Sequence, residues 1–169
     1  LFRSDGIIAL SGCLSGEIPY LIGQRDMDGA MAVAGEFQEI FGKDHFYLEV
    51  QANGLDHQRI ANAGLVEIHK KLGIPMAGTN DCHYLNKEDA RPHELMLCLQ
   101  TGKTVSDPHR MKFDTDQLYV KSTEEIAPAF AEFPGAVMNT CRIADHCALD
   151  LPLNKTYLPQ YRIPDGFKD

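Results

Sequence analysis

The sequence predicts an α/β fold in which parallel strands alternate with helices. Three short runs rich in apolar residues, at 7–11, 46–51 and 74–79, have the length and composition of strands, and a helical pattern follows each of them. Strands joined by helices form a parallel sheet with right-handed crossovers. Three such units are too few to close a β/α barrel, so we expect a partial barrel up to residue 105 and a mostly helical extension after it.

Two helices are expected after the strand at 7–11. That strand ends in a turn of small residues over 12–16, and a short helix is expected over 17–22. A longer helix should begin at Asp26 or Asp28 and stop at Gly42. Its apolar residues recur at helical spacing and mark the face that packs on the core: Ala30, Ala34, Phe37 and Phe41.

The second and third strands differ in pattern. In the strand at 46–51, apolar residues alternate with polar ones, so one face should pack on the core. Glu49 and Gln51 lie on the polar side, and we expect both to be solvated at a sheet edge, with the interior of a barrel as the alternative. A helix over 56–72 leads to the more uniformly apolar strand at 74–79.

The chain changes character after a further helix expected over 86–101. A short strand is predicted over 117–121. Ser122 then begins a capping box, S-x-x-E, for a helix that Pro128 should cut short, because proline removes a helical hydrogen bond and clashes with the preceding turn.

A last helix and a tail complete the predicted elements. The helix should cover 136–149, with inward-facing residues Val137, Cys141, Ala144 and Ala148. The residues at 151–169 include three prolines and predict an extended linker.

Composition narrows the class of protein. The net charge of −8 and the scattered basic residues do not favour nucleic-acid binding by this segment alone. Five cysteines without a C-x-x-C pair predict reduced thiols and a cytoplasmic location. No apolar run approaches the roughly 20 residues of a membrane span, so no membrane partner is expected. The chain has no initiator Met, and we expect it to be a piece of a longer protein.

Candidate metal ligands follow two of the predicted strands. Asp81 and His83 come directly after the strand at 74–79, and their two-residue spacing in an extended segment projects both side chains to one side. Cys13 follows the first strand, and the carboxyl ends of parallel strands share one edge of the sheet. A thiolate, a carboxylate and an imidazole suit zinc or another divalent ion. The alternatives are an exposed turn for the Asp-His pair and a small buried apolar residue for Cys13.

Several segments together resemble the amino-terminal region of the α subunits of bacterial DNA polymerase III, the C-family replicative polymerases. The matching segments occur in the same order and extend over essentially the whole chain. Each segment alone is a weak signal, but together they are specific for this family. The matching segments are 10–19 (LSGCLSGEIP), 46–49 (FYLE), 79–85 (TNDCHYL), 100–104 (QTGKT), 119–122 (YVKS) and the helix over 134–149.

The resemblance implies a domain organisation. In that family the region is the carboxyl-terminal part of the PHP (polymerase and histidinol phosphatase) domain, a distorted β/α barrel. Residues 1–105 would form this part, 106–150 a bridge of one strand and helices toward the polymerase palm, and 151–169 an extended linker. The catalytic aspartates of the palm would lie downstream, so no catalytic residue is expected in this chain.

The resemblance also implies a divalent metal site of Zn, Mn or Mg. Asp81 and His83 match the family's last metal-binding motif, and Cys13 resembles a ligand from an earlier strand. The family's H-x-H motif, which supplies its first ligands, does not occur among the histidines of this chain, so the site is expected to be incomplete.

Two functions follow from the resemblance. The parent would synthesise DNA from deoxynucleotides, and its PHP region would be a metal-binding phosphoesterase-like domain, including 3′–5′ proofreading exonuclease activity. Alternatively, the PHP region would be a catalytically silent scaffold that docks a separate proofreading exonuclease subunit of the replisome. The open side of a partial barrel also makes self-association of the chain an expectation.

Overall fold

A three-stranded parallel sheet forms the centre of the fold in the computed structural model, which describes residues 4–159. The strands are β1 (Ala9–Leu10), β2 (Phe46–Gln51) and β3 (Met76–Thr79), in the spatial order β1-β2-β3. All neighbours are parallel, with Ala9 beside Phe46 and Gln51 beside Thr79. The predicted α/β class with a parallel sheet is confirmed.

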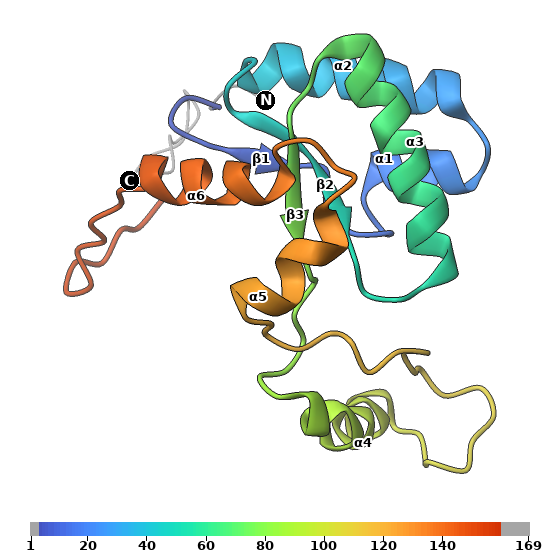
Figure 1. Cartoon of the computed structure of the whole chain (residues 1–169). Coiled ribbons are helices and arrows are strands. Elements are labelled where there is room, and N and C mark those ends of the chain that lie inside the picture. Colours follow the sequence, from blue (N-terminus) through green and yellow to red (C-terminus); the bar gives the residue numbers. More distant parts are fainter. Residues whose placement is uncertain (1–3, 160–169) are drawn as a thin grey trace, which may run out of the picture.

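Three helices cover one face of the sheet (Figure 1). They are α1 (Glu17–Gly23), α2 (Met27–Phe41) and α3 (Asp56–Leu72), and they connect the strands in the predicted order. The apolar side of β2 joins the core, as expected. The core contains Ile18, Ile22, Ala30, Ala34, Phe46, Leu48, Val50, Leu65, Ile68, Ile74 and Met76.

Helix α1 approaches α3 closely because α3 has a glycine at the contact. A Cβ atom built on Gly64 would lie 2.6 Å from a side-chain carbon of Ile22, which is itself almost fully buried. The glycine therefore allows α1 to reach the layer formed by α2 and α3, with which it makes most of its contacts.

A helical satellite lies beyond the carboxyl end of β3 (Figure 1). It consists of the short 3₁₀ helix η1 (Lys87–Asp89) and α4 (Ala90–Thr101), and a long loop returns from it toward the sheet. Asn86 and Asp89 form a capping box at its start, and Gly102 ends α4 in the left-handed conformation.

The helical extension packs against the sheet. It comprises α5 (Thr123–Ile126), the 3₁₀ helix η2 (Ala127–Phe130) and α6 (Ala136–His146). The predicted Ser122 capping box is present, and the α-helix ends two residues before Pro128. The side chain of Asn139 on α6 donates to the backbone oxygen of Met76 in β3 at 2.7 Å.

Two predictions for this extension are wrong. The segment 117–121 is no strand, since only Tyr119 forms an isolated bridge, to Tyr84. Helix α6 ends at His146 rather than at Leu149, and its buried residues are Ala136 and Asn139. The residues predicted to face inward include three that are exposed, Cys141, Ala144 and Ala148. The reason is that α6 contacts β3 mainly through its amino-terminal half, where these buried residues lie.

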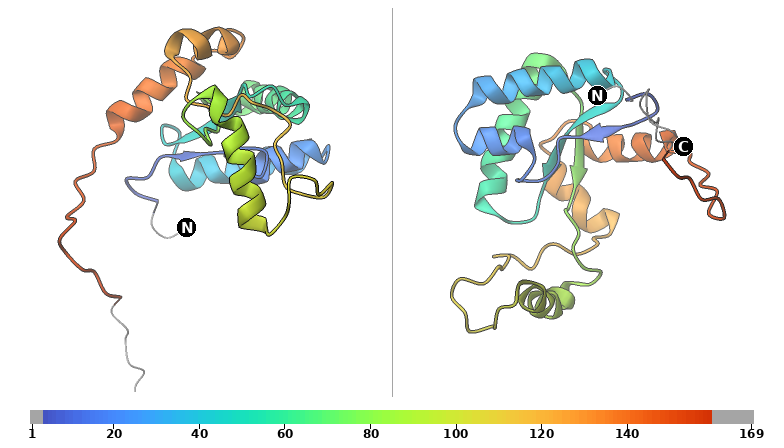
Figure 2. Two further views of the ribbon diagram at one scale, coloured as in Figure 1. Left: turned by 90° about the horizontal axis from the view of Figure 1, so that it is seen from below. Right: turned by 180° about the vertical axis from the view of Figure 1, so that it is seen from behind.

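The tail leaves the domain as an irregular segment (Figure 2). Residues 147–159 contain neither helix nor strand, and the rest of the predicted linker, 160–169, lies outside the described residues. Over 4–159, no helix combines the length and the apolar character needed to cross a membrane.

Candidate metal site and its aromatic neighbours

Asp81 and His83 lie together just beyond the carboxyl end of β3. Asp81 Oδ1 is 3.5 Å from His83 Nε2, and each side chain keeps about 33% of its exposure to solvent. Asp81 adopts a left-handed backbone conformation with φ of 50°, which is uncommon for a residue other than glycine. A carboxylate and an imidazole at this distance can serve one divalent ion as an oxygen and a nitrogen ligand.

A buried asparagine holds this strand end in place. Asn80 donates through Nδ2 to the backbone oxygens of Gln117 at 2.7 Å and Tyr119 at 2.8 Å. Its Oδ1 accepts from Lys121 Nζ at 3.0 Å. The backbone amide of His83 donates to Leu118 O at 2.8 Å, so the segment 117–121 braces both sides of Asp81.

Lys121 is itself fixed by this brace. Its ammonium group also donates to Gln117 O at 2.7 Å and lies 4.7 Å from the centre of the Tyr119 ring. Burial lowers the pKa of Lys121 from its usual value, because removing an ammonium group from water penalises the charged form. The carbonyl and amide oxygens around Nζ compensate for part of that penalty.

We expect Asn80→Ala to destabilise the protein by roughly 2 kcal/mol, because a buried side chain loses two hydrogen bonds to backbone carbonyls and one from Lys121. Chemical denaturation monitored by circular dichroism measures this change. Asn86→Ala, at an exposed position in the same loop, is the control and should have a smaller effect, near the 1 kcal/mol order of a helix cap. Equal midpoints for the two variants would contradict the bracing role.

Cys13 does not join the Asp-His pair. It is half-buried in the turn after β1, and β2 separates that strand from β3. Two strand spacings correspond to roughly 10 Å. Among residues 4–159, no three His, Cys, Asp or Glu side chains lie close enough to hold an ion together. The structure thus brings together two of the predicted ligands, and the assignment of all three to one metal site stays a prediction.

Hydrogen bonds link the polar side of β2 to its neighbours. Glu49 Oε1 accepts from Thr79 Oγ1 at 2.5 Å and from Gln51 Nε2 at 3.0 Å. The backbone amide of Glu49 donates to Ser11 Oγ at 2.8 Å. Gln51 is 1% exposed, so the expectation of a solvated edge residue is wrong for it, and Glu49 is half-buried. The network links all three strands because β2 is the central one. The alternation of apolar and polar residues within β2 does not indicate this central position.

Aromatic side chains surround His83 on the side of the satellite. The ring centre of His83 lies 4.8 Å from that of Phe113 and 5.5 Å from that of His93. Tyr84 is next to His93, with ring centres 5.4 Å apart. Burial first, and then the nearby His83, lower the pKa of His93, so its imidazole is neutral at pH 7.

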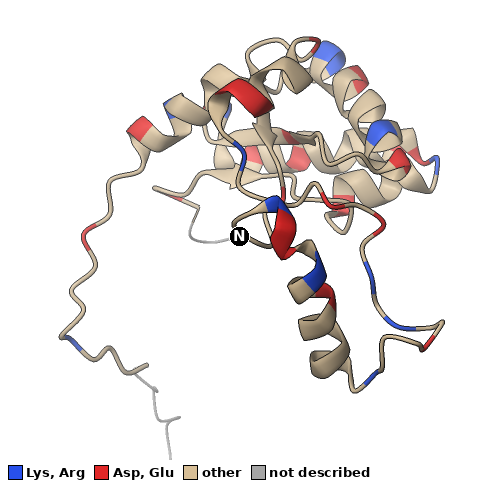
Figure 3. Cartoon of the chain, turned by 60° about the horizontal axis from the view of Figure 1, so that its bottom comes forward, with Lys and Arg blue, Asp and Glu red and all other residues tan. Residues whose placement is uncertain are grey.

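Charged residues are distributed over the whole molecule rather than gathered at this site (Figure 3). Basic and acidic side chains are interspersed along α3, α4 and the loop after α4. Electrostatic attraction of a polyanion by this segment as a whole is therefore weak, and recognition here depends on local groups.

Comparison with known proteins gives the family. The PHP domain family matches residues 2–53, which include Cys13 and Glu49 and end before Asp81. DNA polymerase III subunit alpha of Treponema pallidum is 42% identical over 165 residues, which make up 98% of this chain and 14% of that protein. The same subunit of Thermus aquaticus is 41% identical over 170 residues, and that of Borreliella burgdorferi is 39% identical over 165 residues. Each alignment covers 97% of this chain.

The aligned region covers very different fractions of this chain and of its relatives. This chain aligns almost completely, yet it spans only 14% of each of these relatives. The aligned region combines the PHP match, the Asp81–His83 strand end and the helical extension in one continuous segment. The chain therefore belongs, as a segment that includes part of the PHP domain, to the family of bacterial DNA polymerase III α subunits.

Proposed function

We propose that this chain forms the metal-binding edge of a PHP domain in a DNA polymerase III α subunit, and that Asp81 and His83 are a ligand pair of that edge. The observation that carries the proposal is their 3.5 Å contact directly after β3. PHP domains generally bind metals. The imidazole nitrogen of His83 suits Zn, and the carboxylate oxygen of Asp81 suits Mn or Mg. We keep Cys13 as a proposed third ligand, for an ion that binds between the ends of β1 and β3.

A divalent ion in such a site activates water and polarises a phosphoryl group, which is the chemistry of phosphodiester hydrolysis. The residues of this chain would position that ion. Asn80 fixes the backbone on one side of Asp81, and the bond from the His83 amide to Leu118 fixes the other. Because the backbone is held in this way, the two donor atoms stay near each other before any ligand binds.

For the whole protein, we propose DNA-directed DNA synthesis from deoxynucleotides in the bacterial cytoplasm, with the other replisome subunits as partners. The support is the relatives' name together with their similarity over nearly the full chain. The metal-bearing PHP edge would add hydrolysis of phosphodiesters, including 3′–5′ proofreading.

Metal titration tests the ligand pair. We expect His83→Gln and Asp81→Asn each to weaken Mn²⁺ or Zn²⁺ binding to this chain at least tenfold, about 1.4 kcal/mol, because each removes one of few ligands. Isothermal titration calorimetry measures the affinity. His57→Gln, at an exposed position on α3, is the matched histidine control and should bind metal like the unmodified chain. Unchanged affinity in both site variants would exclude this pair as ligands.

A second candidate function is a scaffold that docks a separate proofreading exonuclease subunit. One face of α4 favours it, because Leu95, Met96 and Leu99 are 42%, 62% and 77% exposed at helical spacing. In the full-length parent, loss of exonuclease binding in Leu99→Asp, with unchanged nuclease activity and metal content in Asp81→Asn, would favour the scaffold. The reverse result favours the metal-dependent function.

A further inference from the structure

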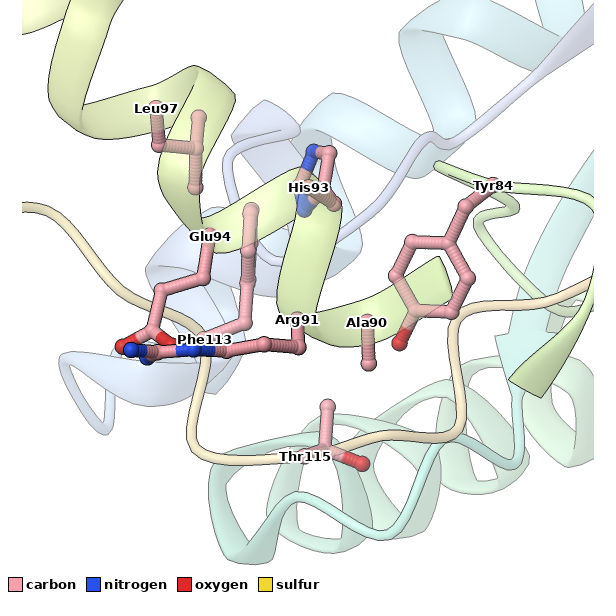
Figure 4. Close-up of a pocket in the computed structure, with 8 residues that line it drawn as sticks. All are labelled: Tyr84, Ala90, Arg91, His93, Glu94, Leu97, Phe113 and Thr115. Carbon is pink, nitrogen blue, oxygen red and sulfur yellow. The ribbon is translucent and has the colours of Figure 1, made fainter. Parts of the chain in front are cut away.

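A pocket of about 260 Å³ opens next to the metal-site candidate, between α4 and the loop that returns from it (Figure 4). Its walls carry three rings, those of Tyr84, His93 and Phe113. The His93 ring stands between the other two, with centres 5.4 Å from Tyr84 and 5.8 Å from Phe113. Ala90 on α4 leaves space between the rings, and Thr115 from the loop faces it (Figure 4).

Two charged side chains, Arg91 and Glu94, line this pocket. Glu94 forms ion pairs with both Arg91 and Arg110, so two guanidinium groups share one carboxylate. The hydrogen bond from Arg91 is the main cause of the lowered pKa of Glu94, which stays ionised at neutral pH. Arg110 also has a buried Nη1 without a hydrogen-bond partner within residues 4–159. Because Glu94 is shared with Arg110, the exposed guanidinium group of Arg91 keeps positive charge that can attract an anion at the rim.

We propose that this pocket is a nucleotide subsite, in which one nucleobase stacks on the ring of Phe113 and its phosphate lies near Arg91. Flat aromatic side chains bind bases of any sequence because every base has a π-face. The volume lies below the roughly 300 Å³ at which pockets begin to hold drug-sized ligands, so it suits one ring system rather than several. His83 contacts Phe113, so the candidate metal pair lies next to the ring on which the base would stack.

The proposal deepens the proposed function, since a nucleotide subsite beside a metal site names the substrate of that site. It predicts base-dependent binding even when no metal is bound. The binding test is therefore done in EDTA, where its result does not depend on whether Asp81 and His83 hold an ion. Failure of the metal titration described above would leave this result unaffected, and the reverse also holds.

The first experiment uses Phe113→Trp as a reporter, because the chain contains no other Trp. Titration with 2′-deoxyadenosine 5′-monophosphate should quench its fluorescence in a saturable manner. The control is 2-deoxyribose 5-phosphate, which lacks the base and should bind at least tenfold more weakly. Equal binding of the two probes would mean that the site recognises only phosphate, and it would overturn the proposal.

The second experiment compares variants by equilibrium dialysis with the same mononucleotide. Phe113→Leu keeps an apolar side chain without a π-face, and affinity should fall at least tenfold, whereas Phe113→Tyr should restore it. Arg91→Met, at an exposed position, keeps the pocket walls and should weaken binding severalfold through the phosphate. Circular dichroism checks that each variant is folded. Affinities in folded Phe113→Leu and Arg91→Met equal to that of the unmodified chain would refute the subsite.

Discussion

Gly16→Ala is expected to destabilise the protein by roughly 3 kcal/mol or more, because the turn after β1 has no room for a side chain. A Cβ atom at this position would lie 2.2 Å from the backbone oxygen of Ser11 and 3.1 Å from that of Cys13. Neither carbonyl can rotate away, since both belong to the main chain of the turn. The backbone φ of Gly16 is −65°, so the effect comes from contact and not from conformational strain.

The turn matters for the site because it determines where Cys13 lies. The Gly16 amide donates to the Cys13 carbonyl at 2.8 Å, and Gly12 has a left-handed φ of 78°. Urea denaturation measures the loss of stability. Gly35→Ala on α2 is the control, because a Cβ there meets no atom within 4 Å, and it should stabilise the helix by about 0.5–1 kcal/mol. A Gly16→Ala midpoint at or above that of the unmodified chain would contradict the packing of this turn.

Asn62→Ala is expected to cost about 3 kcal/mol, because one side chain on α3 satisfies both backbone groups of Gln51 at the end of β2. Asn62 Nδ2 donates to Gln51 O at 2.7 Å, and Asn62 Oδ1 accepts from the Gln51 amide at 3.3 Å. The same oxygen accepts from Gln58 Nε2 at 3.0 Å. Alanine would leave these buried polar groups without partners, and all three residues are at most 7% exposed.

Two further variants of α3 separate this hydrogen bonding from a general effect on the helix. Asn62→Asp retains the acceptor but not the donor to Gln51, and its stability should also fall. Glu67→Ala removes only an exposed ion pair with Lys71 and should change the free energy of unfolding by less than about 0.5 kcal/mol. Thermal and urea unfolding provide the measurement. Similar stability of Asn62→Ala and Glu67→Ala would show that the Gln51 backbone does not depend on Asn62.

The elements that the sequence predicts well are those specified by local patterns. Alternation within 46–51 and helical spacing in α2 are properties of neighbouring residues, and the Ser122 capping box is a four-residue signal. The prediction of a strand over 117–121 is wrong because this segment pairs with the backbone near Tyr84 through a single β-bridge, which is too short to form a strand. The inward face of α6 was also wrong, since it depends on how the helix meets β3.

In the candidate site, too, features that depend on neighbouring residues could be predicted, and features that depend on the tertiary fold could not. Asp81 and His83 are two residues apart, so their proximity could be predicted from the chain. The burial of Gln51 could not, because it results from neighbours on both sides of β2. The aromatic pocket was missed for a related reason. Phe113 reaches His83 only through the fold of the loop after α4, and no local motif marks this contact.

The hydrogen bonds along β3 have a mechanical consequence. Asn139 of α6 holds the strand at Met76, and the segment 117–121 holds its far end at Asn80. The part of the chain that follows α4 thus grips both ends of one short strand. A displacement of that part would therefore pull on both ends of β3 and on the backbone next to Asp81.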